Sequence, residues 1–278
     1  MEQAFAVPYK RNLTLTGRTS LLNTLKAKLF EASEVYNHRI VLSGPGGIGK
    51  TQTALEYAYQ NRHTYESIYW IPAQSLASLI DGYLRIATAE GLRFRENAAP
   101  EQIVQGMISW LGKRKSWLLV LDGLDGTTVR SSVFPENGSM RHTIITARNG
   151  NARAFSAQKL EVPILDQEEA LQLLSTVSGV SLPPESPLRK TGEIIVRELG
   201  CLPLAVYHAA MYIRQVGGSP DTYLNELENN RKKLLNWTPV DNKQYSHSVR
   251  SVGIKPLPRQ GESSSIRPLP WKKSFWKK

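Results

Sequence analysis

Cysteine is almost absent from this sequence of 278 residues, in which Cys201 is the single example. An internal disulfide is therefore excluded, and so is a zinc site built from several cysteines. The five histidines show no metal-ligand spacing, and the sequence has no Gly-x-Ser-x-Gly nucleophile motif. Zinc chemistry and Ser/His/Asp catalysis are therefore not supported. A chain with one thiol fits a reducing compartment, so we expect a cytoplasmic protein.

Long hydrophobic runs are missing as well. The longest, at residues 117–121, is far shorter than the roughly 18–20 apolar residues of a membrane-spanning helix. Residues 1–10 contain no apolar signal core. Hydrophobic residues make up 41% of the chain and charged residues 21%, as in ordinary globular proteins. We therefore expect a soluble globular chain with about two domains.

Acidic side chains are scarce only towards the C-terminal end. Residues 1–230 contain 23 Lys and Arg against 22 Asp and Glu, and carry a net charge of +1. Residues 231–278 contain 12 against 2, and carry +10 of the total of +11. Because the body of the chain is nearly neutral, a body that binds nucleic acid is disfavoured.

Residues 238–278 are rich in Ser, Pro, Lys and Arg, a composition that predicts a disordered tail. Two segments of this tail leave other functions open. Residues 267–270, Arg-Pro-Leu-Pro, are similar to part of a polyproline ligand for an SH3-like groove. Residues 271–278 mix Trp and Phe with Lys, as in segments that contact anionic lipid or RNA. A solvated tail is the main expectation.

Strand-like and helix-like segments alternate in the first part of the chain. Four short aliphatic or β-branched runs predict strands, and a fifth run is weaker. These runs are residues 39–43, 67–72, 117–121, 142–146 and, weakest, 160–164. A segment after Pro100 has apolar residues at helical spacing. Strands separated by helices predict an α/β fold with a parallel sheet.

The pattern changes at Asp166. Asp166 and Glu169 have the spacing of a helix capping box, and four helical segments follow without a strand signal. We therefore predict an N-terminal arm and helix, an α/β domain, a small all-α subdomain and the tail. Their boundaries are 1–35, 36–165, 166–237 and 238–278.

The strongest chemical signal is a glycine-rich loop between a predicted strand and a predicted helix. Residues 44–51 read Gly-Pro-Gly-Gly-Ile-Gly-Lys-Thr and match the phosphate-binding pattern of P-loop NTPases in full. Glycines let successive backbone N–H groups point at one phosphate, and the helix N-terminus adds its positive dipole end. We expect Lys50 to reach the β- and γ-phosphates and Thr51 to bind Mg²⁺. The other expected nucleotide contacts here are Gly44, Gly46, Gly47, Ile48, Gly49 and Gln52.

Three polar residues follow aliphatic runs. Asp122 ends a run of four aliphatic residues, at the edge where parallel sheets bind ligands, and is expected to coordinate Mg²⁺ as the Walker B acid. Asp125 either polarises the attacking water or is a turn aspartate before Gly126. Arg148 ends another strand and is expected to read the γ-phosphate, which would distinguish ATP from ADP. A solvated loop arginine is the alternative.

Five motifs over about residues 12–240 resemble, in order, those of the NB-ARC group of STAND-type nucleotide switches. This group forms the regulatory ATPase module of NOD-like and plant-resistance-type receptors. The first motif is Leu-Thr-Gly-Arg at residues 15–18, and the second is the glycine-rich loop. The next two are the strands ending at Asp122 and Arg148, and the last is Gly-Cys-Leu-Pro-Leu-Ala at residues 200–205.

The resemblance implies roles for residues outside the loop. Gly17 and Arg18 match the family segment that flanks the adenine, and Pro203 matches a proline that packs against it. The helical region after Asp166 matches the family's helical lid. The implied ligands are therefore ATP or ADP, with Mg²⁺.

The family's function implies a signal-transduction switch in innate immunity. ADP would hold the chain in an off state, and ATP would shift it towards an assembling state with slow hydrolysis, a homo-oligomer and an unknown signalling partner. Gly123 stands where many relatives carry a second acid, which favours slow hydrolysis over rapid turnover. Two alternatives stay open: a turnover ATPase of the AAA-like remodelling type, and an inactive fragment that acts as a basic-tailed adaptor.

The family pattern also predicts what would follow the helical region. Relatives continue after about residue 237 into a winged-helix domain and ligand-sensing repeats, whereas this sequence continues into the basic tail. The sequence shows no tetratricopeptide or leucine-rich repeat period. The resemblance is therefore to a member truncated before the winged-helix and repeat regions, and a truncated or mis-spliced product is one open interpretation.

Overall fold

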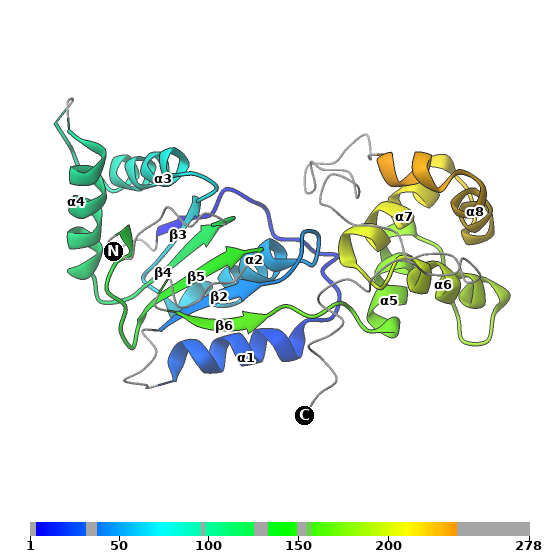
Figure 1. Cartoon of the computed structure of the whole chain (residues 1–278). Coiled ribbons are helices and arrows are strands. Elements are labelled where there is room, and N and C mark those ends of the chain that lie inside the picture. Colours follow the sequence, from blue (N-terminus) through cyan, green and yellow to red (C-terminus); the bar gives the residue numbers. More distant parts are fainter. Residues whose placement is uncertain are drawn as a thin grey trace, which may run out of the picture.

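The computed structural model describes residues 4–31, 38–95, 98–124, 133–148, 155 and 157–237. Asp125 and the predicted tail lie outside these residues. The first part is a parallel sheet whose strand order is β1-β3-β4-β5-β2-β6 (Figure 1). Its strands are β1 (Ala4–Ala6), β2 (Arg39–Ser43), β3 (Ser67–Pro72), β4 (Trp117–Asp122), β5 (Arg141–Ala147) and β6 (Gln158–Glu161).

Helices cover both faces of this sheet. The helices of this part are α1 (Thr19–Phe30), α2 (Lys50–Gln60), α3 (Leu76–Ala89) and α4 (Pro100–Gly112), with a short 3-10 turn η1 (Arg62–Thr64). Alternate residues of β4 point to opposite faces, as in any strand. Leu118 and Val120 join the apolar cluster of α1 and α2, whereas Leu119 and Leu121 join that of α3 and α4. This two-sided burial explains the continuous aliphatic runs in the sequence.

The five strands predicted from the sequence are present, with small shifts at their ends. The weakest, expected at residues 160–164, is β6 and ends at Glu161. Pro163 follows shortly after it and has no backbone N–H to donate to a neighbouring strand. The sequence did not predict β1, because three residues at a sheet edge carry no periodic signal.

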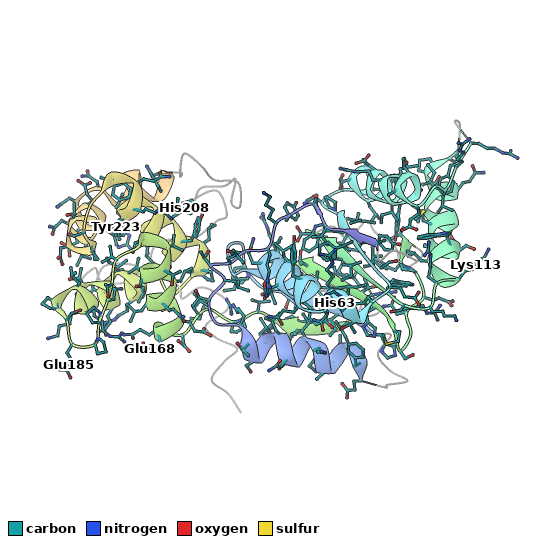
Figure 2. The ribbon with its side chains drawn as sticks, turned by 180° about the vertical axis from the view of Figure 1, so that it is seen from behind. His63, Lys113, Glu168, Glu185, His208 and Tyr223 are labelled. Carbon is teal, nitrogen blue, oxygen red and sulfur yellow. The ribbon has the colours of Figure 1, made fainter. Side chains whose placement is uncertain are left out.

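Four helices follow the sheet (Figure 1). They are α5 (Gln167–Ser178), α6 (Pro187–Glu198), α7 (Pro203–Val216) and α8 (Pro220–Asn236). The predicted capping box is confirmed: the Glu169 N–H donates to Asp166 Oδ1 at 2.8 Å, and the Asp166 N–H donates to Glu169 Oε2 at 3.0 Å. Figure 2 shows His208 and Tyr223, both buried, within this helical part. The expected fold class, a parallel α/β sheet followed by a small all-α unit, is therefore confirmed.

The sheet and the helical part touch beside the glycine-rich loop. The backbone N–H of Leu204, in the first turn of α7, donates to the Gly47 carbonyl oxygen at 3.2 Å. The Leu165 N–H donates to the Cys201 carbonyl oxygen at a similar distance, 3.2 Å. Among the described helices, none has the length and apolar character needed to cross a membrane.

Candidate functional site

The glycine-rich loop joins β2 to α2 at the carboxyl edge of the sheet. Gly47 and Gly49 have φ angles of +75° and +98°, a region that side chains disfavour. A Cβ atom on Gly44, whose φ is +147°, would lie 3.2 Å from Ile48 Cγ2. Because α2 begins at Lys50, its N-terminal N–H groups and dipole face the loop. The loop therefore has the strand, turn and helix arrangement that phosphate binding requires.

The Lys50 side chain folds back over this loop. Its Nζ donates to the carbonyl oxygens of Gly44 and Pro45 at 2.8 and 2.9 Å. These bonds hold an ammonium group at the mouth of the loop. An anion with several oxygens fits this place, because both the backbone dipoles and the lysine carry positive charge.

Asp122 lies directly across from the start of α2. Its Oδ1 accepts hydrogen bonds from Thr51 Oγ1 at 2.8 Å and from Thr146 Oγ1 at 2.7 Å. The structure thus brings together the two residues predicted to bind Mg²⁺. A carboxylate and a hydroxyl are oxygen ligands of the kind that Mg²⁺ prefers, with water and phosphate completing its shell. In the described part of the chain, no cluster of three His, Cys, Asp or Glu side chains could hold a metal ion instead.

Thr146 and Gln74 flank the residue after Asp122, and the sequence analysis assigned neither of them a role. The Gly123 N–H donates to Thr146 Oγ1 at 2.8 Å. Gly123 has a φ of +83°, and a Cβ atom there would lie 3.1 Å from Gln74 Cγ and 3.2 Å from Gln74 Nε2. An acid at position 123 would therefore meet both backbone strain and the Gln74 side chain.

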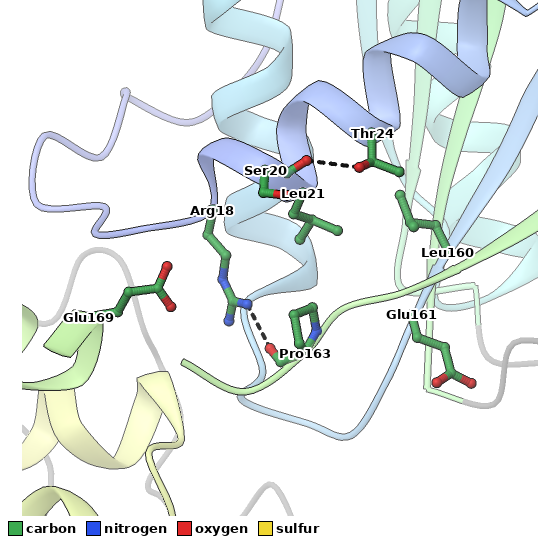
Figure 3. A pocket seen from close by; sticks show the side chains of 8 residues that line it. All are labelled: Arg18, Ser20, Leu21, Thr24, Leu160, Glu161, Pro163 and Glu169. Atoms are coloured by element: carbon green, nitrogen blue, oxygen red, sulfur yellow. Dashed lines mark hydrogen bonds between the residues drawn. The ribbon is translucent and has the colours of Figure 1, made fainter. Parts of the chain in front are cut away.

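Arg18 is buried and ties three segments together. Its Nη1 donates to the Pro163 carbonyl oxygen at 2.6 Å (Figure 3). Its Nη2 donates to the Ile48 carbonyl oxygen at 3.0 Å. Burial lowers the pKa of the guanidinium, and the nearby Glu169 carboxylate partly opposes that shift. The side chain thus connects the glycine-rich loop to the segment that leads into α5.

Gly17 is required for a close approach of α5. Its φ is +69°, and a Cβ atom there would lie 2.1 Å from Glu169 Oε1. Glu169 and Arg18 also line a pocket of about 260 Å³ between α1, β6 and α5 (Figure 3). The other lining residues are Ser20, Leu21, Thr24, Leu160, Glu161 and Pro163.

The N-terminal arm runs along one side of α2, a feature that the sequence analysis missed. Asn12 Nδ2 donates to Gln52 Oε1 at 3.0 Å, and the Arg11 guanidinium pairs with Glu56 at 2.6 Å. Burial, and then the charge of Asp122, raises the pKa of Tyr9 in the same arm. Gln52, an expected nucleotide contact, is thus engaged by the arm.

Three further residues were expected in the site: Pro203, Arg148 and Asp125. Pro203 opens α7 beside the glycine-rich loop, since the next residue bonds to Gly47. Arg148 follows β5 directly at the carboxyl edge of the sheet and is exposed. Asp125 lies outside the described residues. The loop, Thr51, Asp122, Arg18 and the start of α7 therefore converge at one edge of the sheet.

Comparison with known proteins agrees with this arrangement. The NB-ARC domain family model matches residues 18–181. A nucleotide-binding leucine-rich repeat (NLR)-like protein of Hyaloscypha variabilis is 28% identical over 247 residues. That alignment covers 81% of this chain but 24% of the relative, so the chain spans about a quarter of the relative's length.

Comparison with solved structures gives similar chains, and two of them superpose on most of this one. The Aeropyrum pernix ORC2 protein, in ADPNP-ADP complexes, superposes with a TM-score of 0.52 at 14% identity. The superposition covers 84% of this chain and 74% of that protein. Cdc6p of Pyrobaculum aerophilum gives a TM-score of 0.48 at 14% identity, over 76% of this chain and 66% of that one.

Proposed function

Because the chain belongs to the NB-ARC family, whose domain is a nucleotide-binding NTPase-like module, we propose that it is an ATP/ADP-binding switch in signal transduction. One observation carries the proposal: Lys50, Thr51 and Asp122 meet around the glycine-rich loop. A loop that only closed a strand-helix turn would need neither the lysine nor the hydroxyl-carboxylate pair.

Phosphate and Mg²⁺ binding are assigned to this cluster. The N–H groups of residues 44–51 and the Lys50 ammonium would hold the phosphates, and Thr51 and Asp122 would hold Mg²⁺ directly or through water. When bound, the ion neutralises phosphate charge as the terminal phosphate leaves. The Thr51 hydroxyl already donates to Asp122 Oδ1 at 2.8 Å, so the two oxygens that we assign to Mg²⁺ lie side by side.

The adenine end of the nucleotide is assigned to the seam between sheet and helices. Gly17, Arg18 and Pro203 belong to motifs that flank the adenine in the family, and in this chain Arg18 and the start of α7 both bond to the loop. The ORC2 neighbour, whose fold is similar, was solved with ADPNP and ADP. These observations favour an adenine nucleotide held between the sheet and residues 166–237, which we take as a lid subdomain.

Switching needs a group that distinguishes ATP from ADP, and we assign this role to Arg148. Moving a two-state equilibrium from 1:99 to 99:1 takes about 5.5 kcal/mol of differential affinity. A guanidinium at the carboxyl edge can contribute by binding the γ-phosphate in two places. The ADP form would be the off state, and the ATP form the state that assembles with itself or a signalling partner.

Slow hydrolysis would return the switch to its off state. Gly123 supplies no carboxylate to accept a proton from water. An acidic residue at this position is disfavoured, because a φ of +83° is strained for any residue with a side chain and because Gln74 lies adjacent. General-base assistance typically raises a rate by about 10²–10⁴-fold. Its absence would slow hydrolysis by a factor on the order of 10²–10⁴. This observation favours a switch over a turnover ATPase.

Nucleotide titration tests the proposal. The chain is stripped of nucleotide and titrated with ADP, and with a non-hydrolysable ATP analogue plus Mg²⁺. We expect Arg148→Ala to weaken binding of the analogue about tenfold while ADP affinity is unchanged. Arg141→Ala, at the other end of β5, is the matched control and should change neither. Absence of binding by the wild-type chain, or equal weakening of both ligands in Arg148→Ala, contradicts the proposal.

A further inference from the structure

Gln74 stands beside the Walker B segment because the pairing of β3 with β4 continues past the strand ends. Pro72 lies opposite Asp122 in the sheet register. The Ala73 N–H then donates to the Asp122 carbonyl oxygen at 2.7 Å, which extends the ladder by one step. In this register Ala73 comes opposite Gly123, and Gln74 is the next residue along the chain. The backbone therefore places Gln74 at the carboxyl edge of the sheet, and its side chain lies close to Gly123, the residue after Asp122.

The backbone at Gln74 is fixed on its other side too. Ser75 is the N-cap of α3, and its hydroxyl accepts from the Ser78 N–H at 3.1 Å. The Ser78 hydroxyl in turn accepts from the Ser75 N–H at 2.9 Å. A residue held between a sheet ladder and a capping box has little backbone freedom. Its exposed side chain can thus be aimed reproducibly.

The Gln74 carboxamide fills the space that a side chain at position 123 would take. A Cβ atom on Gly123 would lie 3.2 Å from Gln74 Nε2 and 3.4 Å from Gln74 Cδ. Thr146 holds the opposite side of the same turn through its bond to the Gly123 N–H. The segment from Asp122 to Gly123 is thus bracketed by a hydroxyl from β5 and an amide from the end of β3.

We propose that the Gln74 carboxamide positions the attacking water in ATP hydrolysis, in the place where an acid at position 123 would otherwise stand. The inference rests on the proposed function and deepens it. An amide offers one acceptor and two donor hydrogens. Its oxygen can accept a hydrogen bond from water while its NH₂ group donates to an oxygen of the γ-phosphate. Glutamine orients the attacking water in this way in other phosphoryl-transfer enzymes.

The reaction needs no proton from the glutamine. The water oxygen bonds to the γ-phosphorus as the bond from that phosphorus to the β,γ-bridging oxygen breaks, and ADP leaves with the electron pair. One water proton stays on the new phosphate hydroxyl and the other passes to a phosphate oxygen, giving ADP and dihydrogen phosphate. Because a neutral amide orients water but does not deprotonate it, the step is slow, as a switch requires.

Single-turnover hydrolysis tests the inference. The full chain, in excess over radiolabelled ATP with Mg²⁺, is compared with Gln74→Ala and Gln74→Glu. We expect Gln74→Ala to slow phosphate release about tenfold or more, with unchanged affinity for ATP, because only the orientation of water is lost. Gln74→Glu keeps an acceptor at this place and should match or exceed the wild-type rate. A purely structural role for Gln74 would change affinity and rate together.

The matched control is Gln172→Ala, which removes an exposed glutamine from α5 and should leave the rate unchanged. If Gln74→Ala hydrolyses ATP at the wild-type rate, or if Gln74→Glu is as slow as Gln74→Ala, the inference is wrong and the proposed function stands. A wild-type chain that binds ATP without hydrolysing it overturns the inference and the proposed slow hydrolysis, while nucleotide binding stands. A wild-type chain that binds no nucleotide overturns both.

Discussion

The two edges of the sheet both contain buried polar side chains, but they use them differently. At the amino edge, His142 is fully buried at the start of β5. Its Nε2 lies 3.0 Å from the Ser139 carbonyl oxygen and therefore donates, which leaves Nδ1 to accept from the Tyr65 hydroxyl at 2.7 Å. The Tyr57 hydroxyl then donates to Tyr65 at 3.1 Å. Each of these three hydrogen bonds joins two groups within the protein.

At the carboxyl edge, the polar groups belong to the segments that we assign to phosphate and Mg²⁺ binding. Thr51 and Thr146 both donate to one oxygen of Asp122, and the Lys50 ammonium group donates to two loop carbonyl oxygens. Glycines with positive φ angles, Gly44, Gly47 and Gly49, lie in the loop beside these groups. Phe30 and His38, by contrast, pack directly on the His142 ring, with centroids 4.6 and 5.6 Å away.

This difference separates polar side chains that stabilise the fold from polar side chains that we assign to ligand binding. A closed network of hydrogen bonds stabilises the fold, and removing one member leaves another buried group unsatisfied. The polar groups at the carboxyl edge are assigned to binding a ligand instead. Substitutions at the two edges should therefore affect different measurements.

The largest expected effect is at the carboxyl edge. Lys50→Ala should weaken nucleotide binding by about a thousandfold, because it removes the charge that faces the phosphates. The unfolding free energy of the nucleotide-free chain should change little, because the lysine is half-buried and water can replace its bonds to the Gly44 and Pro45 carbonyl oxygens. Titration calorimetry and urea unfolding measure the two quantities.

Tyr65→Phe is the mirror experiment at the amino edge. It leaves His142 Nδ1 buried without its donor and should cost about 1–3 kcal/mol of unfolding free energy, with unchanged nucleotide affinity. If Tyr65→Phe weakened nucleotide binding, or Lys50→Ala destabilised the empty chain, the contrast between the edges would fail.

Lowering the pH should also reduce the stability of the chain through His142 at the amino edge. Burial lowers the pKa of His142 to about 4, whereas an unfolded histidine titrates near 6.5. The unfolded chain therefore binds more protons between these values, and this contribution to stability is complete above about pH 6.5 and is lost as the pH falls to about 4. The loss amounts to about 3 kcal/mol. His142→Gln should flatten this part of the pH dependence in urea unfolding, and an unchanged slope would contradict the assignment.

The smallest expected effect lies at the seam with the helical part. Gly17→Ala should cost about 1–2 kcal/mol, because alanine disfavours a φ of +69° and its Cβ meets Glu169. Glu169→Ala in the same chain removes the clash but not the backbone strain, so it should recover part of the loss. A double variant no more stable than Gly17→Ala in thermal unfolding would show that Glu169 does not set the glycine requirement.

Much of the fold could be predicted because its signals are local. The aliphatic strands, the glycine-rich loop before a helix, and the capping box of Asp166 and Glu169 each lie within a few residues of sequence. The pairing of Thr51 with Asp122 could also be predicted, because parallel strands bring their carboxyl ends to one edge.

The residues that were missed depend on contacts between distant segments. Gln74 acquires its place only through the register of β3 with β4, which no local pattern shows. Asn12 and Arg11 pair with residues of α2 that lie 40 and 45 positions away. A glutamine shortly after a predicted strand, residues 67–72, was the available signal for Gln74.

The most direct test of the central claim is the nucleotide that the purified chain carries. The chain of 278 residues is purified and denatured, and any released nucleotide is identified by chromatography, with Lys50→Ala as the control. The account predicts near-stoichiometric ADP from the wild-type chain and none from the variant. A folded wild-type chain that releases no nucleotide and does not bind ATP with Mg²⁺ would contradict it.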